Sequence, residues 1–265
     1  MKVEFNDVEL SYVDRGTGLP ILFVHGFPLD GALWQPQVDG LSDEYRVIVP
    51  DLRGCGGSTV SLAMTMEQYA DDLRLLLDEL GIEEVVLAGL SMGGYIALAF
   101  YRMAPGRLRG LVLVDTRPQA DSDEARANRT ATAKQVIEHG AVTLADGMLD
   151  KLLSPATFKD QPDLVRTVRA MMARQPVFGI VAALHGMAER PDSRPLLGEI
   201  SVPTLVVVGA DDVITPVAEA ESMVEAIPGS ELVVIPDAGH LSNLEQPQAF
   251  NQALREFLVN RVAGA

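Results

Sequence analysis

The chain has 265 residues, of which 48% are hydrophobic and 22% are charged, and its formal net charge at pH 7 is -16. This length can bury a sizeable core as one domain with an insertion. The acidic charge argues against nucleic acid and anionic membrane surfaces as partners, and no apolar run is long enough to span a bilayer. Residues 1–7 lack the apolar core of an export signal, and the single cysteine, Cys55, cannot form an internal disulfide. We therefore expect a cytoplasmic protein.

Strand-like and helix-like runs alternate through the first 115 residues and again through the last third of the chain. Alternation of this kind with wholly apolar strands predicts a parallel sheet covered by helices on both faces. Ligands of such sheets bind at the carboxyl ends of the strands. The predicted strands are 8–13, 21–24, 46–50, 85–88, 110–114, 204–209 and 231–235, and the predicted helices are 65–80, the segment from Met92, 216–226 and 247–259.

The strand signal disappears between about residues 116 and 200, where the chain is helix-forming and interrupted by prolines. We predict a helical cap at 118–195, inserted into a core made of 1–117 and 196–265. Four side chains of this segment are predicted to line a substrate pocket, because methionine adapts to varied apolar shapes. The alternative is that they only pack the cap onto the core. They are Met171, Met172, Phe178 and Met187.

The most informative motif is Gly89-Leu90-Ser91-Met92-Gly93, which follows one predicted strand and precedes a predicted helix. A serine in that setting lies on a very sharp turn, and the flanking glycines remove Cβ atoms that would collide. Its hydroxyl then stands beside the free N–H groups of a helix N-terminus. The motif predicts Ser91 as a nucleophile, and the alternative is an ordinary glycine-rich turn.

A serine nucleophile needs a base, and the chain has four histidines. His240 follows a strand at the same sheet edge as Ser91, so its Nε2 can face the serine while its Nδ1 faces an acid. His25 also follows a strand and is the alternative base, although a loop-shaping role explains it more simply. His139 and His185 fall in the cap helices and are interpreted as surface or packing residues. We therefore predict His240 as the base.

The acid is expected after another strand on the same edge, and the run Gly209 to Pro216 supplies it. Asp212 is the predicted acid, with Asp211 as a close alternative. Asp115, after the preceding strand, is the third position from which a carboxylate can reach His240. Glu245, just before Gln246-Pro247, is interpreted as favouring a helix N-terminus.

The resulting order of Ser91, Asp212 and His240 along the chain is the order expected for an α/β-hydrolase. Five landmarks make the chain resemble that superfamily over nearly its full length. The resemblance implies an α/β fold with a mostly parallel eight-stranded sheet, helices on both faces and a helical cap insertion. The landmarks are His25-Gly26-Phe27-Pro28, Asp51-Leu52-Arg53-Gly54-Cys55-Gly56-Gly57-Ser58, Gly89-Leu90-Ser91-Met92-Gly93-Gly94, Gly209-Ala210-Asp211-Asp212 to Pro216, and Gly239-His240.

The resemblance also implies an oxyanion hole formed by the backbone N–H groups of Phe27 and Met92. One donor follows the nucleophile, and the other lies on the loop after the first central strand, so the residues point to the same pair. His25 and Trp34 are further candidates for the pocket wall, and helix packing explains Trp34 equally well.

The expected activity is hydrolysis of carboxylic esters of small, mainly apolar molecules through an acyl-enzyme, with no metal or organic cofactor. The motifs also resemble enol-lactone hydrolases, carbon–carbon bond hydrolases and cofactor-free haloperoxidases that act as perhydrolases. Ser91 argues against epoxide hydrolases and haloalkane dehalogenases, whose nucleophile is an aspartate. A ligand-binding signalling protein on the same scaffold is the alternative outside enzymes.

Overall fold

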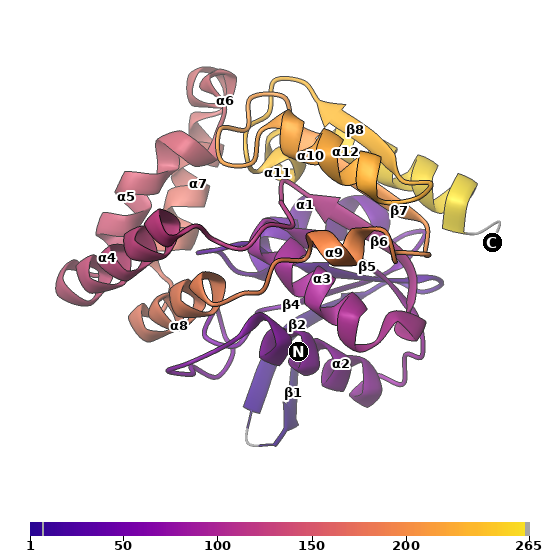
Figure 1. Ribbon diagram of the computed structural model, residues 1–265, viewed down its shortest axis with the longest axis horizontal. Helices are drawn as coiled ribbons and strands as arrows, with labels where there is room; N and C mark the ends of the chain where they lie inside the picture. The colour runs from indigo at the N-terminus through magenta and orange to yellow at the C-terminus, as the bar shows by residue number, and fades with distance from the viewer. Residues whose placement is uncertain (7, 263–265) are drawn as a thin grey trace.

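The computed structural model describes residues 1–6 and 8–262, and residues 7 and 263–265 of the predicted core lie outside it. Eight strands form one sheet in the order β1-β2-β4-β3-β5-β6-β7-β8 (Figure 1). β2 pairs antiparallel with β1 and β4, and every other pairing is parallel. The predicted mostly parallel eight-stranded sheet is therefore confirmed. The strands are β1 (Lys2–Phe5), β2 (Val8–Arg15), β3 (Pro20–Val24), β4 (Arg46–Pro50), β5 (Val85–Leu90), β6 (Leu108–Val114), β7 (Thr204–Gly209) and β8 (Glu231–Ile235).

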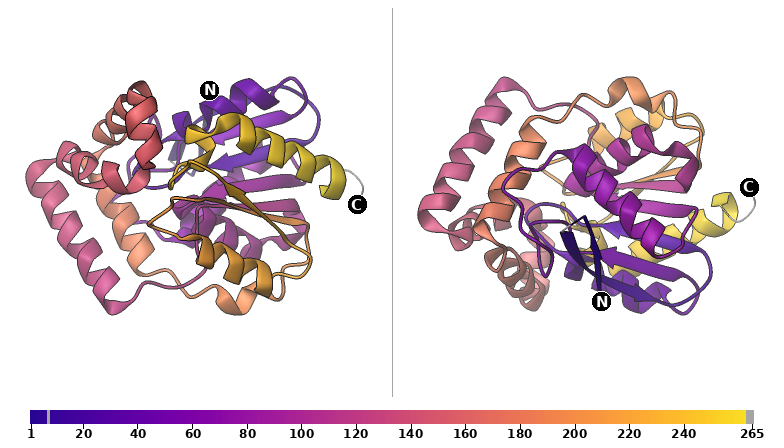
Figure 2. Two further views of the ribbon diagram at one scale, coloured as in Figure 1. Left: turned by 90° about the horizontal axis from the view of Figure 1, so that it is seen from above. Right: turned by 90° about the horizontal axis from the view of Figure 1, so that it is seen from below.

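The central strands are apolar throughout because both of their faces are buried. Along β3, Ile21 and Phe23 enter one hydrophobic cluster, whereas Leu22 and Val24 enter the other. The two clusters lie on opposite sides of the sheet because successive side chains of a strand point to opposite faces. Helices cover both sides (Figure 2). The helices are α2 (Met66–Glu79), α3 (Met92–Met103) and α10 (Val217–Ala226) on the side of Leu22, and α1 (Gln35–Leu41) and α12 (Pro247–Phe257) on the side of Phe23.

Helix α2 shows how local sequence fixes the ends of an element. The Thr65 side chain accepts a hydrogen bond from the Gln68 N–H, and the Gln68 side chain accepts one from the Thr65 N–H. This reciprocal pair satisfies N–H groups that the first turn leaves free. After the helix, Gly81 has φ of 65°, a conformation that glycine adopts at little cost. The predicted helix at 65–80 is thus confirmed, with both ends explained.

Six helices lie between β6 and β7, and the first five of them form a helical insertion at one end of the sheet (Figures 1 and 2). The sequence predicts four helices here, at 126–139, 141–152, 162–174 and 178–188. The helix Pro155–Asp160 was not predicted, because Pro155 was interpreted as a helix breaker. Pro155 instead occupies the first turn of this helix, where its missing N–H costs nothing, and the Ser154 side chain caps the helix. The cap boundaries at 118–195 remain a prediction. The helices are α4 (Asp123–His139), α5 (Ala141–Leu152), α6 (Pro155–Asp160), α7 (Pro162–Ala173) and α8 (Val177–Ala188).

The remaining elements are short. They connect or extend the main helices, and none was predicted from the sequence apart from the first two residues of the last one, which the predicted helix 247–259 includes. They are the 3-10 helices η1 (Gly31–Trp34) and η2 (Pro105–Arg107), the helices α9 (Arg194–Leu197) and α11 (Ser242–Glu245), and the π-helix η3 (Leu258–Val262).

The strand order creates a crevice at a defined place. The chain passes outward from β3 to β4 and then returns to β5, which pairs with the other edge of β3. The carboxyl ends of β3 and β5 therefore flank a topological switch point, where open α/β sheets bind ligands. Across residues 1–6 and 8–262, no helix combines the length and the apolar character required to traverse a bilayer.

Candidate active site

Ser91 lies on the turn between β5 and α3 with φ of 54° and ψ of -112°, which is strained for a residue with a Cβ. The flanking glycines make this turn possible. A Cβ on Gly89 would overlap the carbonyl oxygen of Gly93, and a Cβ on Gly93 would overlap the carbonyl oxygen of Val24. The Thr116 hydroxyl donates a 2.8 Å hydrogen bond to the Ser91 carbonyl oxygen and supports the turn. Such strain persists only where the surroundings impose it, as at functional sites.

His240 connects the serine to an acid. Its Nε2 lies 2.8 Å from Ser91 Oγ, and its Nδ1 lies 2.7 Å from Asp212 Oδ2. The three residues come from the carboxyl ends of β5, β7 and β8, respectively. The structure therefore brings together the three side chains that the sequence selects, in the relative geometry of a nucleophile, a base and an orienting acid.

Asp212 is held by more than the histidine. Its Oδ1 accepts hydrogen bonds from the N–H groups of Ile214 (2.8 Å) and Thr215 (3.0 Å), and its Oδ2 accepts one from the Thr215 hydroxyl at 2.6 Å. Burial favours the neutral acid, but the hydrogen bonds from His240 and Thr215 outweigh it and lower the pKa of Asp212. Asp212 is therefore ionised at neutral pH. Thr215 is a supporting residue that the sequence analysis missed.

The imidazole of His240 is almost fully buried, and burial by itself lowers its pKa. The hydrogen bond and charge of Asp212, with the charges of Asp115 and Glu245, outweigh burial and raise the pKa above the ordinary histidine value. The Asp212 carboxylate is the main group that stabilises the imidazolium that forms when His240 takes a proton. A base with this property can assist attack by the serine hydroxyl.

The two alternative acids occupy other positions. Asp115 is fully buried, and its Oδ1 accepts a hydrogen bond from the Gly209 N–H, while its Oδ2 accepts them from the N–H and hydroxyl of Ser242. Burial and the neighbouring charge of Asp212 raise the pKa of Asp115 to about 8. Asp211 is exposed. Asp212 is thus the carboxylate that bonds to the imidazole.

The loop after β3 passes close to the serine, since a Cβ on Gly26 would lie 3.2 Å from Ser91 Cβ. Phe27 follows Gly26 on this loop, and Met92 follows Ser91 as the first residue of α3. Neither the Phe27 N–H nor the Met92 N–H donates a hydrogen bond to another of the described residues. Both donors therefore remain available for an oxyanion beside Ser91.

Two of the predicted pocket residues lie elsewhere, and both assignments are corrected. The His25 ring is fully buried, with Nε2 accepting the Leu52 N–H at 3.0 Å and Nδ1 3.0 Å from the Gly26 carbonyl oxygen. It shapes loops, as the alternative interpretation held, and is neither a base nor a pocket wall. The Trp34 ring is fully buried against Phe23 and Phe250, at centroid distances of 4.8 and 5.8 Å, so it packs the core.

The four cap residues have different surroundings. Met171 and Met172 are buried in the hydrophobic cluster that includes side chains of α5, and Met187 is buried on α8. Phe178 is 58% exposed. A role of these side chains in a substrate pocket remains a prediction.

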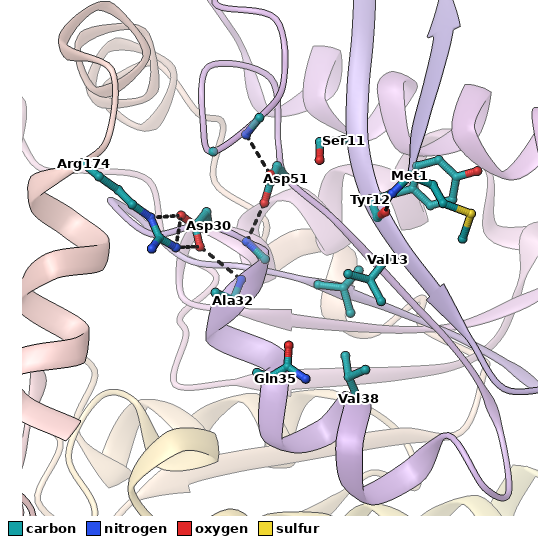
Figure 3. Close-up of a pocket in the computed structure, with 14 residues that line it drawn as sticks. Met1, Ser11, Tyr12, Val13, Asp30, Ala32, Gln35, Val38, Asp51 and Arg174 are labelled. Carbon is teal, nitrogen blue, oxygen red and sulfur yellow. Dashed lines mark hydrogen bonds and ion pairs between the residues drawn. The ribbon is translucent and has the colours of Figure 1, made fainter. Parts of the chain in front are cut away.

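A separate pocket of about 470 Å³ lies beside β2 and η1 (Figure 3). At its wall, Arg174 donates from Nε and Nη2 to the two carboxylate oxygens of Asp30, each at 2.8 Å. Asp51 accepts hydrogen bonds from the N–H groups of Gly31 and Gly57 on either side of this pocket. The Arg174–Asp30 pair ties the end of α7 to the loop that carries Phe27. Residues 1–6 and 8–262 contain no group of three or more His, Cys, Asp or Glu side chains arranged to hold a metal ion.

Residues 20–247 match the family model described as alpha/beta hydrolase fold. The chain belongs to this family. The predicted superfamily is therefore confirmed, and the positions of Ser91 after β5, Asp212 after β7 and His240 after β8 are those of an α/β-hydrolase.

Relatives of this α/β-hydrolase include enzymes of more than one activity. It is similar to the structure of a thermophilic esterase from Thermogutta terrifontis, with 50% identity, a TM-score of 0.94 and coverage of 95% of this chain and 93% of that chain. It is 33% identical to 3-oxoadipate enol-lactonase 2 of Acinetobacter baylyi over 94% of this chain and 92% of the relative. The structure of the enol-lactonase from Burkholderia xenovorans has 28% identity and a TM-score of 0.92, covering 98% of this chain and 100% of that one.

Proposed function

We propose that this α/β-hydrolase is a serine hydrolase that cleaves carboxylic esters of small, mainly apolar molecules through an acyl-enzyme. The observation that carries the proposal is the continuous contact from Ser91 Oγ through His240 to Asp212, with distances of 2.8 and 2.7 Å. The esterase and the two enol-lactonases among the similar proteins support the same class of chemistry, because an enol-lactone is an internal ester.

In the acylation step, His240 Nε2 takes the proton of Ser91 Oγ as the oxygen attacks the ester carbonyl carbon. The carbonyl π bond opens, and the resulting oxyanion accepts hydrogen bonds from the N–H groups of Phe27 and Met92. Asp212 keeps the proton on His240 Nδ1, so that Nε2 is the free base, and stabilises the imidazolium. Nε2 then returns its proton to the leaving alcohol as the carbon–oxygen bond breaks.

Deacylation repeats the sequence with water. His240 removes a proton from a water molecule as it attacks the acyl carbon, and the same two N–H groups hold the second oxyanion. Collapse of this intermediate releases the acid and returns the proton to Ser91 Oγ. One oxyanion donor is worth on the order of 3 kcal/mol of transition-state stabilisation.

A second candidate activity is enol-lactone hydrolysis, which the 33% identity to 3-oxoadipate enol-lactonase 2 over 94% of this chain favours. Ring-opening would use the same residues, with the leaving enolate kept within the product. The two activities differ in whether the leaving oxygen stays attached to the acyl group.

The test is hydrolysis of p-nitrophenyl butyrate and of an enol-lactone by the wild type, Ser91→Ala and Ser61→Ala. Ser61 is a half-buried serine on the loop before α2, outside the site, and provides the matched control. We expect Ser91→Ala to lose at least about 10³-fold in kcat, because the nucleophile is removed, and Ser61→Ala to match the wild type. Equal turnover by the wild type and Ser91→Ala would contradict the proposal. A higher kcat/KM for the enol-lactone would favour the second candidate.

Labelling with a fluorophosphonate separates enzymes from ligand-binding proteins on this scaffold. An activated serine forms a phosphonyl ester and releases fluoride, and mass spectrometry locates the modified residue. We expect one modification on Ser91 in the wild type and in Ser61→Ala. Absence of labelling together with absence of hydrolysis would favour the ligand-binding alternative.

A further inference from the structure

The loop that carries His240 is attached to the cap through a buried carboxylate. Glu245 lies at the end of α11 and is 2% exposed. Its Oε1 accepts a hydrogen bond from the Gly239 N–H at 2.8 Å. Its Oε2 accepts hydrogen bonds from the Ser154 N–H at 2.7 Å and from the Thr157 hydroxyl at 2.6 Å. One side chain therefore joins the residue before His240 to the start of α6.

Further contacts join the same two segments. The His240 N–H donates to the Leu152 carbonyl oxygen at 3.0 Å, and the Ser154 hydroxyl donates to the Asp237 carbonyl oxygen at 3.2 Å. A Cβ on Gly239 would lie 2.9 Å from the Ser154 nitrogen, so the two backbones are in direct contact. The junction between α5 and α6 thus also contacts the histidine loop directly, backbone against backbone.

An isolated buried carboxylate is costly unless its hydrogen bonds are made, and within the described part of the chain the Glu245 carboxylate bonds to no arginine or lysine. Its three partners are neutral donors, two from the cap and one from the histidine loop. The carboxylate is therefore stabilised only when both segments are in place. This dependence distinguishes Glu245 from a residue that merely caps a helix.

We propose that Glu245 is a positioning residue that fixes the aim of the His240 imidazole at Ser91 by clamping the histidine loop to the α5–α6 junction of the cap. The inference rests on the proposed hydrolase function and extends it, because it makes the reactive geometry depend on how the cap is docked. A displacement of about 1 Å in a catalytic group can cost on the order of 10²-fold in rate.

The charge of Glu245 predicts a shift in the pH dependence of kcat/KM that a loss of packing does not produce. The carboxylates that raise the pKa of His240 are Asp212 after β7, Asp115 after β6 and Glu245 on α11. Removing the charge of Glu245 destabilises the imidazolium and lowers this pKa. The acid limb of kcat/KM, which follows protonation of the free base, then moves to lower pH.

The decisive variant is Glu245→Gln, which keeps the shape but removes the charge. In either orientation its amide NH₂ faces an N–H donor, Gly239 on one side or Ser154 on the other, so one anchor is lost. We expect kcat on p-nitrophenyl butyrate to fall about tenfold to hundredfold, with KM nearly unchanged. The acid limb is expected to shift to lower pH.

Thr157→Val removes one cap-side hydrogen bond and keeps the charge. We expect a decrease in kcat of about twofold to tenfold with the acid limb in place. The matched control is Asp72→Asn, which changes a buried carboxylate on α2 that bonds to Arg53. Asp72→Asn is expected to lower the thermal unfolding midpoint without changing kcat or the pH profile.

A folded Glu245→Gln with wild-type kcat and an unshifted acid limb would overturn the inference, as would equal losses of kcat in Glu245→Gln and Asp72→Asn. If Glu245→Gln does not fold, Thr157→Val tests the proposal in its place. A wild-type kcat in Thr157→Val would then reject the positioning role of Glu245. Ser91→Ala separates the two proposals. Activity remaining in Ser91→Ala rejects the proposed function, whereas loss of activity there with an unaffected Glu245→Gln rejects only the positioning role.

Discussion

Replacing Asp212 with asparagine tests the assignment of the acid most directly. The side chain accepts four hydrogen bonds, two backbone N–H groups at Oδ1 and the His240 ring and Thr215 hydroxyl at Oδ2. An amide NH₂ at the Oδ1 position would face two N–H donors. The asparagine must therefore keep its oxygen there and present NH₂ to His240 Nδ1.

That orientation predicts the size of the effect. With an N–H donor opposite it, Nδ1 becomes the acceptor, and the ring proton moves to Nε2, which can no longer remove the serine proton. A change of tautomer of this kind in a serine protease lowers kcat about 10⁴-fold, which corresponds to roughly 5.5 kcal/mol in the activation free energy. We expect a loss of 10³- to 10⁴-fold for Asp212→Asn, with about the same range for the ester and for the enol-lactone.

The assay compares kcat of the wild type, Asp212→Asn and Asp115→Asn on p-nitrophenyl butyrate, with circular dichroism to confirm folding. In Asp115→Asn the oxygen still accepts from the Gly209 N–H and the NH₂ can donate to the Ser242 hydroxyl, while the 3.2 Å hydrogen bond from the Ser242 N–H is lost. None of these bonds involves His240, so kcat is expected within about tenfold of the wild type. The reasoning is refuted if Asp115→Asn loses more activity than Asp212→Asn, or if folded Asp212→Asn stays within tenfold of the wild type.

Two further outcomes follow from the site. First, kcat/KM should fall on the acid side of its pH profile as His240 becomes protonated. The midpoint of this fall is expected above the ordinary histidine pKa, because Asp212, Asp115 and Glu245 raise the pKa of His240. A flat profile between pH 5 and 9 would rule out a histidine base. Second, Gly93→Ala places a methyl group against the Val24 carbonyl oxygen and should lower the free energy of unfolding by about 1–3 kcal/mol, measured by urea denaturation. In the control Gly106→Ala the added methyl group has free space, so the free energy of unfolding should not fall.

The fold could be predicted because apolar strands and helical runs alternate with clear boundaries. Strand β5 and the helix that follows it from Met92 are an example. The strand is wholly apolar because both of its faces are buried, and the glycines of the motif permit a sharp turn between the two elements. The first strand, Lys2–Phe5, escaped prediction because it is short and largely exposed, with charged residues at alternate positions. Its place in the sheet depends on pairing with β2, which no local pattern indicates.

The three predicted triad residues could be selected because the carboxyl ends of parallel strands meet at one edge, so position along the chain translates into proximity. Asp212 and Asp115 both satisfy that rule, and the sequence favours Asp212 without excluding Asp115. Their difference depends on which donors surround each carboxylate: Asp115 bonds to Gly209 and Ser242, leaving Asp212 for the imidazole. Likewise, Trp34 packs the core because its ring lies against Phe23 and Phe250, and Phe250 is far away in the sequence.

Glu245 shows where sequence reasoning stops for a physical reason. A carboxylate ahead of Gln246-Pro247 is explained locally by a helix N-terminus, and nothing nearby suggests burial. Its partners Ser154 and Thr157 lie 91 and 88 residues away, on a cap whose placement follows from packing over the whole insertion. A clamp of this kind therefore makes the position of the His240 imidazole depend on how the cap is packed. The α5–α6 junction would then couple the predicted substrate pocket of the cap to the alignment of the His240 imidazole.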